Sequence, residues 1–131
     1  MDKRNFDYID KNLAEIREKI NNAAKSSEFD ISPVMIAAVK YADGDEIKYL
    51  TENAGVTDIG ENRVQQLLEH LDFIDTEKVN LHFIGSLQTN KVKYIIDKVC
   101  LIHSVDSLKL AAEISVSWSV NNVDFYVFIH K

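Results

Sequence analysis

Lys40 stands directly after residues 34–39, the most apolar short run of the chain. Such a run is typical of a buried strand, and an amine at the tip of a buried strand loses contact with water. Burial disfavours the charged ammonium form, and a neutral lysine amine can attack an aldehyde to form a Schiff base. The alternative interpretation is a lysine that ends the strand and extends its amine into solvent. Lys40 is therefore the first candidate for covalent chemistry.

Three other groups of small and polar residues follow predicted strands, at residues 60–62 (Gly-Glu-Asn), 85–86 (Gly-Ser) and 103–104 (His-Ser). In parallel α/β folds, ligands bind at the carboxyl ends of the strands. These groups are far apart in the sequence, but a parallel sheet would bring them and Lys40 to one edge. We therefore expect a ligand site at that edge.

Asn62 and His82 each have a structural and a functional interpretation. Asn62 lies three residues before Gln65 at the start of a predicted helix, which is a capping arrangement, yet a cap at this edge can also touch a ligand. His82 lies two residues before Ile84, so the two side chains share one face of their strand. If that face looks into a barrel, His82 lines the interior, either as a satisfied core histidine or as a ligand contact. We expect His70, by contrast, on a solvated helix face.

The elements that would hold these residues alternate regularly. A leading amphipathic helix over about residues 6–24 is predicted from apolar residues at helical spacing, namely Ile9, Leu13, Ile16 and Ile20. Strands then begin near residues 34, 56, 79, 99 and 123, with a predicted helix after each of the first four. This alternation is typical of right-handed βαβ units and a parallel sheet.

Two α/β folds fit this alternation. A (β/α)8 TIM barrel needs eight such units and about 250 residues, whereas a doubly wound sheet of five strands is complete at this length. The sequence stops inside or just after the apolar run 125–129, with no helix to cover that strand. We therefore expect a single domain over residues 1–131 that forms a barrel truncated after about five strands. Its open sheet edges would invite pairing with other chains.

Composition narrows the classes of partner. The chain has 131 residues, a net charge of −6 and a pI of about 5.1, which argues against a nucleic-acid partner. Cys100 and His103 form one pair without the four ligands of a structural zinc site, so we predict no metal. No stretch approaches the roughly 18 apolar residues of a membrane span, and the charged first residues are unlike a signal peptide. We expect a cytoplasmic protein with a small-molecule cofactor as its partner; these patterns set no oligomeric state.

Four motifs, in this order along the chain, resemble one known family. They lie at residues 35–40 (MIAAVK), 58–65 (DIGENRVQ), 82–91 (HFIGSLQTNK) and 101–107 (LIHSVDS). The family is that of the pyridoxal 5′-phosphate homeostasis proteins, single-domain relatives of the alanine racemase barrel. The match covers about residues 5–118, and four motifs in the same order make it specific.

The resemblance implies a barrel of the alanine racemase N-terminal type that binds pyridoxal 5′-phosphate. Lys40 would hold the cofactor as an internal aldimine and Asn62 would line it; we add His82, from its place on the interior face, as a third cofactor-binding candidate. Family members bind the cofactor and help balance vitamin B6 and amino-acid or keto-acid pools without a firm catalytic activity, so we assign no catalytic residue.

The alternative within the same fold is an amino-acid racemase. That reaction needs an acid–base group on each face of the substrate carbon, and no tyrosine opposite Lys40 can be assigned. The sequence also departs from the family at Val39, where a small polar residue is usual, and at residues 128–130. The serine- and glycine-rich segments that hold the cofactor phosphate in the family have no counterpart in this sequence.

Overall fold

A five-stranded parallel sheet forms the centre of the computed structural model, which describes residues 4–121 and 126–129. Its strands are β1 (Ala37–Ala38), β2 (Asp58–Glu61), β3 (Asn80–Phe83), β4 (Leu101–Val105) and β5 (Tyr126–Ile129). They lie side by side in the order β1-β2-β3-β4-β5. A doubly wound sheet reverses its strand order at a switch point, and this sheet does not. The complete doubly wound module is therefore wrong for this chain.

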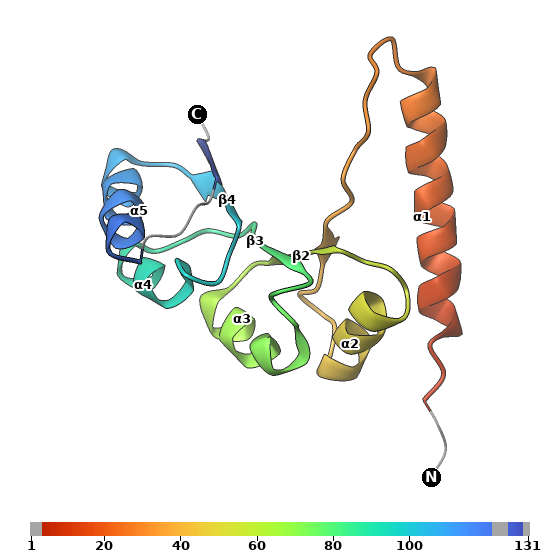
Figure 1. Cartoon of the computed structure of the whole chain (residues 1–131), viewed down its shortest axis with the longest axis horizontal. Helices are drawn as coiled ribbons and strands as arrows, with labels where there is room; N and C mark the ends of the chain where they lie inside the picture. The colour runs from red at the N-terminus through yellow and green to blue at the C-terminus, as the bar shows by residue number, and fades with distance from the viewer. Residues whose placement is uncertain (1–3, 122–125, 130–131) are drawn as a thin grey trace.

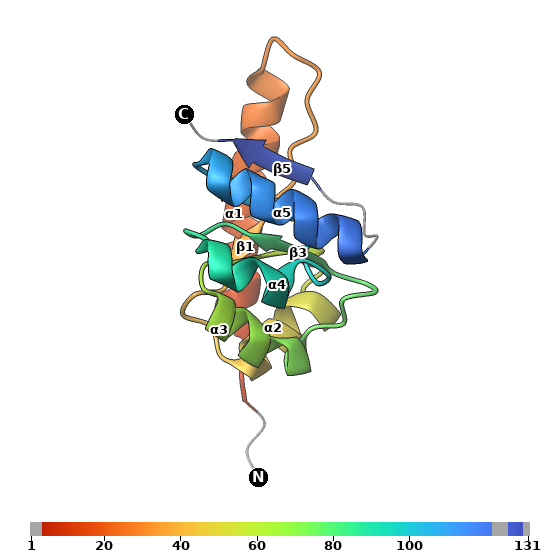
Figure 2. The same ribbon diagram turned by 90° about the vertical axis from the view of Figure 1, so that its left-hand side faces the viewer.

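The first helix precedes β1, and a helix follows each of β1 to β4. The helices are α1 (Asp7–Ser26), α2 (Gly44–Glu52), α3 (Val64–His70), α4 (Val92–Ile95) and α5 (Leu108–Asn121), with single 3-10 turns at η1 (Leu71–Phe73) and η2 (Thr89–Lys91). Figure 1 shows α2, α3 and α4 along one side of the sheet, with α1 standing beside α2. In the turned view, α5 lies between α4 and β5 (Figure 2). The predicted leading helix is confirmed, and so is the strand–helix alternation.

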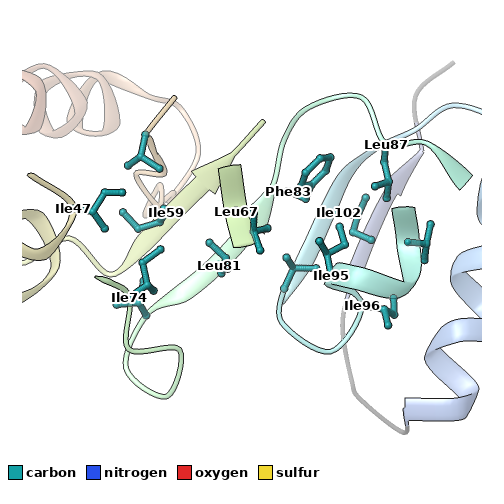
Figure 3. Packing of buried hydrophobic residues seen from close by; sticks show 14 of the residues in the cluster. Ile47, Ile59, Leu67, Ile74, Leu81, Phe83, Leu87, Ile95, Ile96 and Ile102 are labelled. Atoms are coloured by element: carbon teal, nitrogen blue, oxygen red, sulfur yellow. The ribbon is translucent and has the colours of Figure 1, made fainter. Parts of the chain in front are cut away.

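The main core lies between the sheet and these helices. Because side chains alternate along a strand, Ile59, Leu81 and Ile102 face the helices and are each no more than 1% exposed. They pack with helix residues that are equally buried (Figure 3), among them Ile47, Leu67, Ile95 and Ile96. We call the opposite side of the sheet its inner face. Asp58, Gly60 and His82 belong to that face.

The first strand differs from the prediction. A strand buried on both faces was expected over residues 34–39, but only Ala37 and Ala38 are in the strand and Val34 is 68% exposed. The reason is position: β1 is the first strand in the sheet order and pairs with β2 alone among the described residues. Only Val39, which is 1% exposed, is fully buried in this segment.

The last predicted strand is described from Tyr126 onward, and residues 123–125 lie outside the described residues. Over the ranges that the structure describes, no helix is long and apolar enough to cross a membrane.

Candidate functional site

Lys40 lies in a turn two residues beyond β1, at the carboxyl end of the sheet. The turn is closed by a hydrogen bond of 3.1 Å from the backbone N–H of Ala42 to the carbonyl of Val39. A side-chain amide also holds the turn, since Gln66 Nε2 donates to the carbonyl of Lys40 over 2.8 Å. The side chain of Lys40 is exposed, and its Nζ lies 5.4 Å from the centre of the Tyr41 ring. Of the two interpretations, the exposed side chain agrees with a lysine that ends the strand and extends its amine into solvent, because a two-residue edge strand buries little.

A cavity of about 470 Å³ opens beside Lys40. Its walls come from the turn after β1 and from the start of α3, and they comprise Lys40, Tyr41, Arg63, Gln65, Gln66 and Glu69. Cavities of about 300–1,000 Å³ are usual for small ligands. The cavity carries two cations and one carboxylate, so its polar lining suits a charged ligand.

Asn62 is half-buried at the carboxyl end of β2 and does not cap α3. The helix begins at Val64, so that its N-cap is Arg63, which makes no side-chain capping bond. Gln65 is the expected partner in the capping arrangement. Its Nε2 instead donates a hydrogen bond of 3.3 Å to Oε1 of Glu69. The capping prediction is therefore wrong. The helix starts one residue later than predicted, and the side-chain amide of Asn62 does not cap it.

The carboxyl ends of β2, β3 and β4 are tied together just beyond the sheet. A Cβ atom added to Gly85 would lie 2.7 Å from the carbonyl carbon of Asn62, so only glycine allows these two backbones to touch. On its other side, the carbonyl of Gly85 accepts a hydrogen bond from the hydroxyl of Ser104. The predicted ligand edge thus brings Asn62, Gly85 and Ser104 into one continuous rim.

His82 is buried on the inner face, as expected for a barrel interior, and is 7% exposed. Its Nε2 lies 2.8 Å from Asp58 Oδ1, and its Nδ1 lies 3.0 Å from His103 Nε2. Asp58 was not among the candidates predicted from the sequence, although the alternation of β2 places it on the same face as Gly60. Burial raises the pKa of the Asp58 carboxyl, but hydrogen bonds from His82, Thr57 and Asn80 outweigh it and hold that pKa below its ordinary value.

A second buried pair lies on the helix side of the same strands. Glu61 is 0% exposed, and its Oε1 is 2.5 Å from Nδ1 of His70. The expectation of a solvated His70 is wrong, because the histidine turns inward to this carboxylate. Among the residues that the structure describes, Oε2 of Glu61 has no hydrogen-bond partner. Burial raises the pKa of Glu61 above its ordinary value, although the bond to His70 acts in the opposite direction.

Glu61→Gln should make the stability of the protein less dependent on pH. Because folding raises the pKa of Glu61, its contribution is fully present below about pH 4.5 and declines as the pH rises through the folded pKa. The free energy of unfolding of the wild type, relative to Glu61→Gln, should therefore fall between pH 4 and pH 7 in urea titrations. Glu69→Gln, on the exposed side of α3, is the control. A difference that stays constant with pH would contradict this assignment.

Comparison with known proteins gives no matching family model, but it does give relatives. Pyridoxal phosphate homeostasis proteins of Pasteurella multocida and Pseudomonas aeruginosa are both 33% identical to the chain, over 105 and 107 residues. These alignments cover 79% and 82% of the chain but 45% and 46% of the relatives. The homologue from Aquifex aeolicus is 48% identical over 71 residues, which are 54% of the chain and 31% of that protein.

Solved structures agree with these relatives. PipY of Synechococcus elongatus, whose structure was determined with pyridoxal phosphate bound, superposes with a TM-score of 0.72 at 26% identity, covering 91% of the chain and 52% of PipY. An unknown protein from Bifidobacterium adolescentis gives a TM-score of 0.78 at 28% identity over 96% of the chain and 57% of that protein. These relatives and solved structures support the pyridoxal phosphate homeostasis protein family for this chain, which spans less than half the length of the three curated relatives named above.

Proposed function

We propose that the chain binds pyridoxal 5′-phosphate through Lys40, as part of a (β/α)8 barrel that serves vitamin B6 and amino-acid or keto-acid homeostasis. The observation that carries the proposal is the order of the strands. A parallel sheet in sequential order gathers Lys40 and Asn62 at one carboxyl edge, which is where barrels bind their ligands. The names of the relatives and the pyridoxal phosphate in PipY support the choice of cofactor.

The residues present fit the aldehyde end of this cofactor. The cofactor supplies an aldehyde, with which a primary amine condenses with loss of water. Lys40 offers such an amine, which is exposed at the wall of a cavity of about 470 Å³. The amide of Asn62, which the helix start does not use, can orient a polar ring substituent through a hydrogen bond. For the phosphate we assign no residue, since the four glycines of the chain are scattered singly at 44, 55, 60 and 85. We also assign no catalytic residue.

Borohydride trapping tests the proposed function. Purified protein mixed with pyridoxal phosphate and reduced should carry the stable adduct on Lys40, as read by peptide mass mapping. Reduction is irreversible, so it reports the preferred amine even when binding is weak. Lys40→Ala should lose more than nine-tenths of the total adduct, as expected if one amine dominates, whereas Lys93→Ala on α4 should keep it. An adduct spread evenly over Lys91, Lys93 and Lys109 would refute the proposal.

A further inference from the structure

Three titratable side chains from three neighbouring strands form one chain of hydrogen bonds on the inner face. Asp58 comes from β2, His82 from β3 and His103 from β4, with contacts of 2.8 Å and 3.0 Å. The other carboxylate oxygen of Asp58 accepts from the hydroxyl of Thr57 over 2.7 Å. Asp58 and His82 are less than 10% exposed, whereas His103 is only partly buried. The chain therefore runs from a buried carboxylate to a more accessible imidazole.

The hydrogen bonds in this chain have one direction when both imidazoles are neutral. An ionised carboxylate only accepts hydrogen bonds, so Nε2 of His82 carries the hydrogen that points to Asp58. A neutral imidazole has a single N–H, which makes Nδ1 of His82 an acceptor. Nε2 of His103 must then be the donor to it. Both ring nitrogens of His82 are occupied, so His82 has no nitrogen left to bind a ligand.

The register between neighbouring strands determines how far along the sheet each residue lies. Ala38, Gly60, His82 and Leu101 are aligned across β1 to β4. Lys40 and Asn62 follow the carboxyl ends of β1 and β2, and His103 lies two residues beyond Leu101 in β4. The shared contact with His82 shows that His103 is on the inner face. His103 therefore lies beyond the row of His82, toward the carboxyl end of the sheet where Lys40 and Asn62 are found.

We propose that His103 contacts the cofactor and that Asp58 and His82 are positioning residues that fix the orientation and tautomer of its ring. This inference rests on the proposed function. The ligand contact is thereby assigned to His103 on β4 instead of His82, the candidate named from the sequence.

The positioning role is tested without any cofactor, by histidine ¹⁵N NMR at pH 8, above the ordinary imidazole pKa of about 6.5. Wild-type His82 and His103 should both be Nε2–H tautomers. In Asp58→Asn the amide oxygen should take the place next to Thr57, so that the amide N–H faces His82. His82 and then His103 should both switch to the Nδ1–H tautomer, although Asp58 does not touch His103. His70, bonded to Glu61 on the helix side, is the internal control.

Unchanged His103 signals in a folded Asp58→Asn variant, checked by circular dichroism, would overturn the positioning role. If that variant does not fold, the wild-type spectrum decides: an Nδ1–H tautomer at either histidine would overturn the proposed direction.

The ligand contact is tested by adding pyridoxal phosphate to the labelled protein. The signals of His103 should shift while those of His70 stay in place, and His103→Ala should weaken binding about tenfold, as for loss of one hydrogen-bonded contact. Adduct on Lys40 with unmoved His103 signals would overturn this contact and leave the proposed function intact. Absence of any specific adduct would overturn both, whereas the tautomer experiment would still decide the positioning role.

Discussion

Gly85→Ala should lower the free energy of unfolding by about 3 kcal/mol, at the upper end of the usual cost of overpacking. The added Cβ would meet the backbone of Asn62, with the carbonyl carbon at 2.7 Å and Cα at 2.8 Å. Backbone atoms have no rotamer to escape into, so the ends of β2 and β3 must move apart. The same movement would displace Asn62, and trapping at Lys40 should lose its specificity. Urea denaturation and peptide mapping of the variant measure the two effects.

Two neighbouring substitutions serve as controls for Gly85→Ala. A Cβ on Gly60 would meet only the tips of Ile84 and Ile36, at 2.9 Å and 3.0 Å. Those side chains can rotate, so Gly60→Ala should cost about 1 kcal/mol. Ser86→Ala, at an exposed position, should stay within about 0.5 kcal/mol of the wild type. Equal stability of all three variants would mean that the backbones of Asn62 and Gly85 do not touch.

Phe83→Ala should destabilise the protein by about 3–5 kcal/mol, as truncation of a buried aromatic ring usually does. Phe83 is 0% exposed and packs on the helix side of β3, near Leu87 and Ile102 (Figure 3). The loss combines the hydrophobic burial of the ring with the cavity that remains. Phe83→Leu should cost less than half as much because it refills most of the space.

Phe29→Ala provides the matched control for Phe83→Ala, since Phe29 is 73% exposed and should change stability by no more than about 0.5 kcal/mol. Both variants are compared by their urea midpoints, with the slope of the transition as a check that the folded state is unchanged. A loss below about 1 kcal/mol for Phe83→Ala would place the ring outside the main core.

Local sequence patterns were sufficient to predict the order of the helices and strands along the chain. The apolar spacing of Ile9 and Leu13 predicted α1, and the repeat of about 20–24 residues predicted each later strand and helix. These predictions succeeded because period and turn chemistry act between residues that are close in the sequence. Asn62 shows the limit of such patterns. Its spacing to Gln65 suits a cap, but the helix starts one residue later and Gln65 bonds to Glu69.

Burial was decided by neighbours that no local pattern specifies. Residues 34–39 are apolar enough for a central strand, yet β1 lies at the start of the strand order and leaves Val34 and Lys40 exposed. The sequence around His70 is typical of an exposed helix position, but in the structure its Nδ1 lies 2.5 Å from Oε1 of Glu61.

The sequence by itself indicated the family, through four motifs in order, and the strand–helix alternation that places Lys40, Asn62 and His103 toward the carboxyl ends of three different strands. Only the tertiary structure decided which polar groups meet. Asp58, His82 and His103 are separated by 24 and 21 residues, and they come within 3.0 Å because parallel pairing aligns their strands and alternation turns all three side chains to one face. A hydrogen bond between distant residues depends on the register between strands, and that register is set by the packing of the whole sheet against its helices.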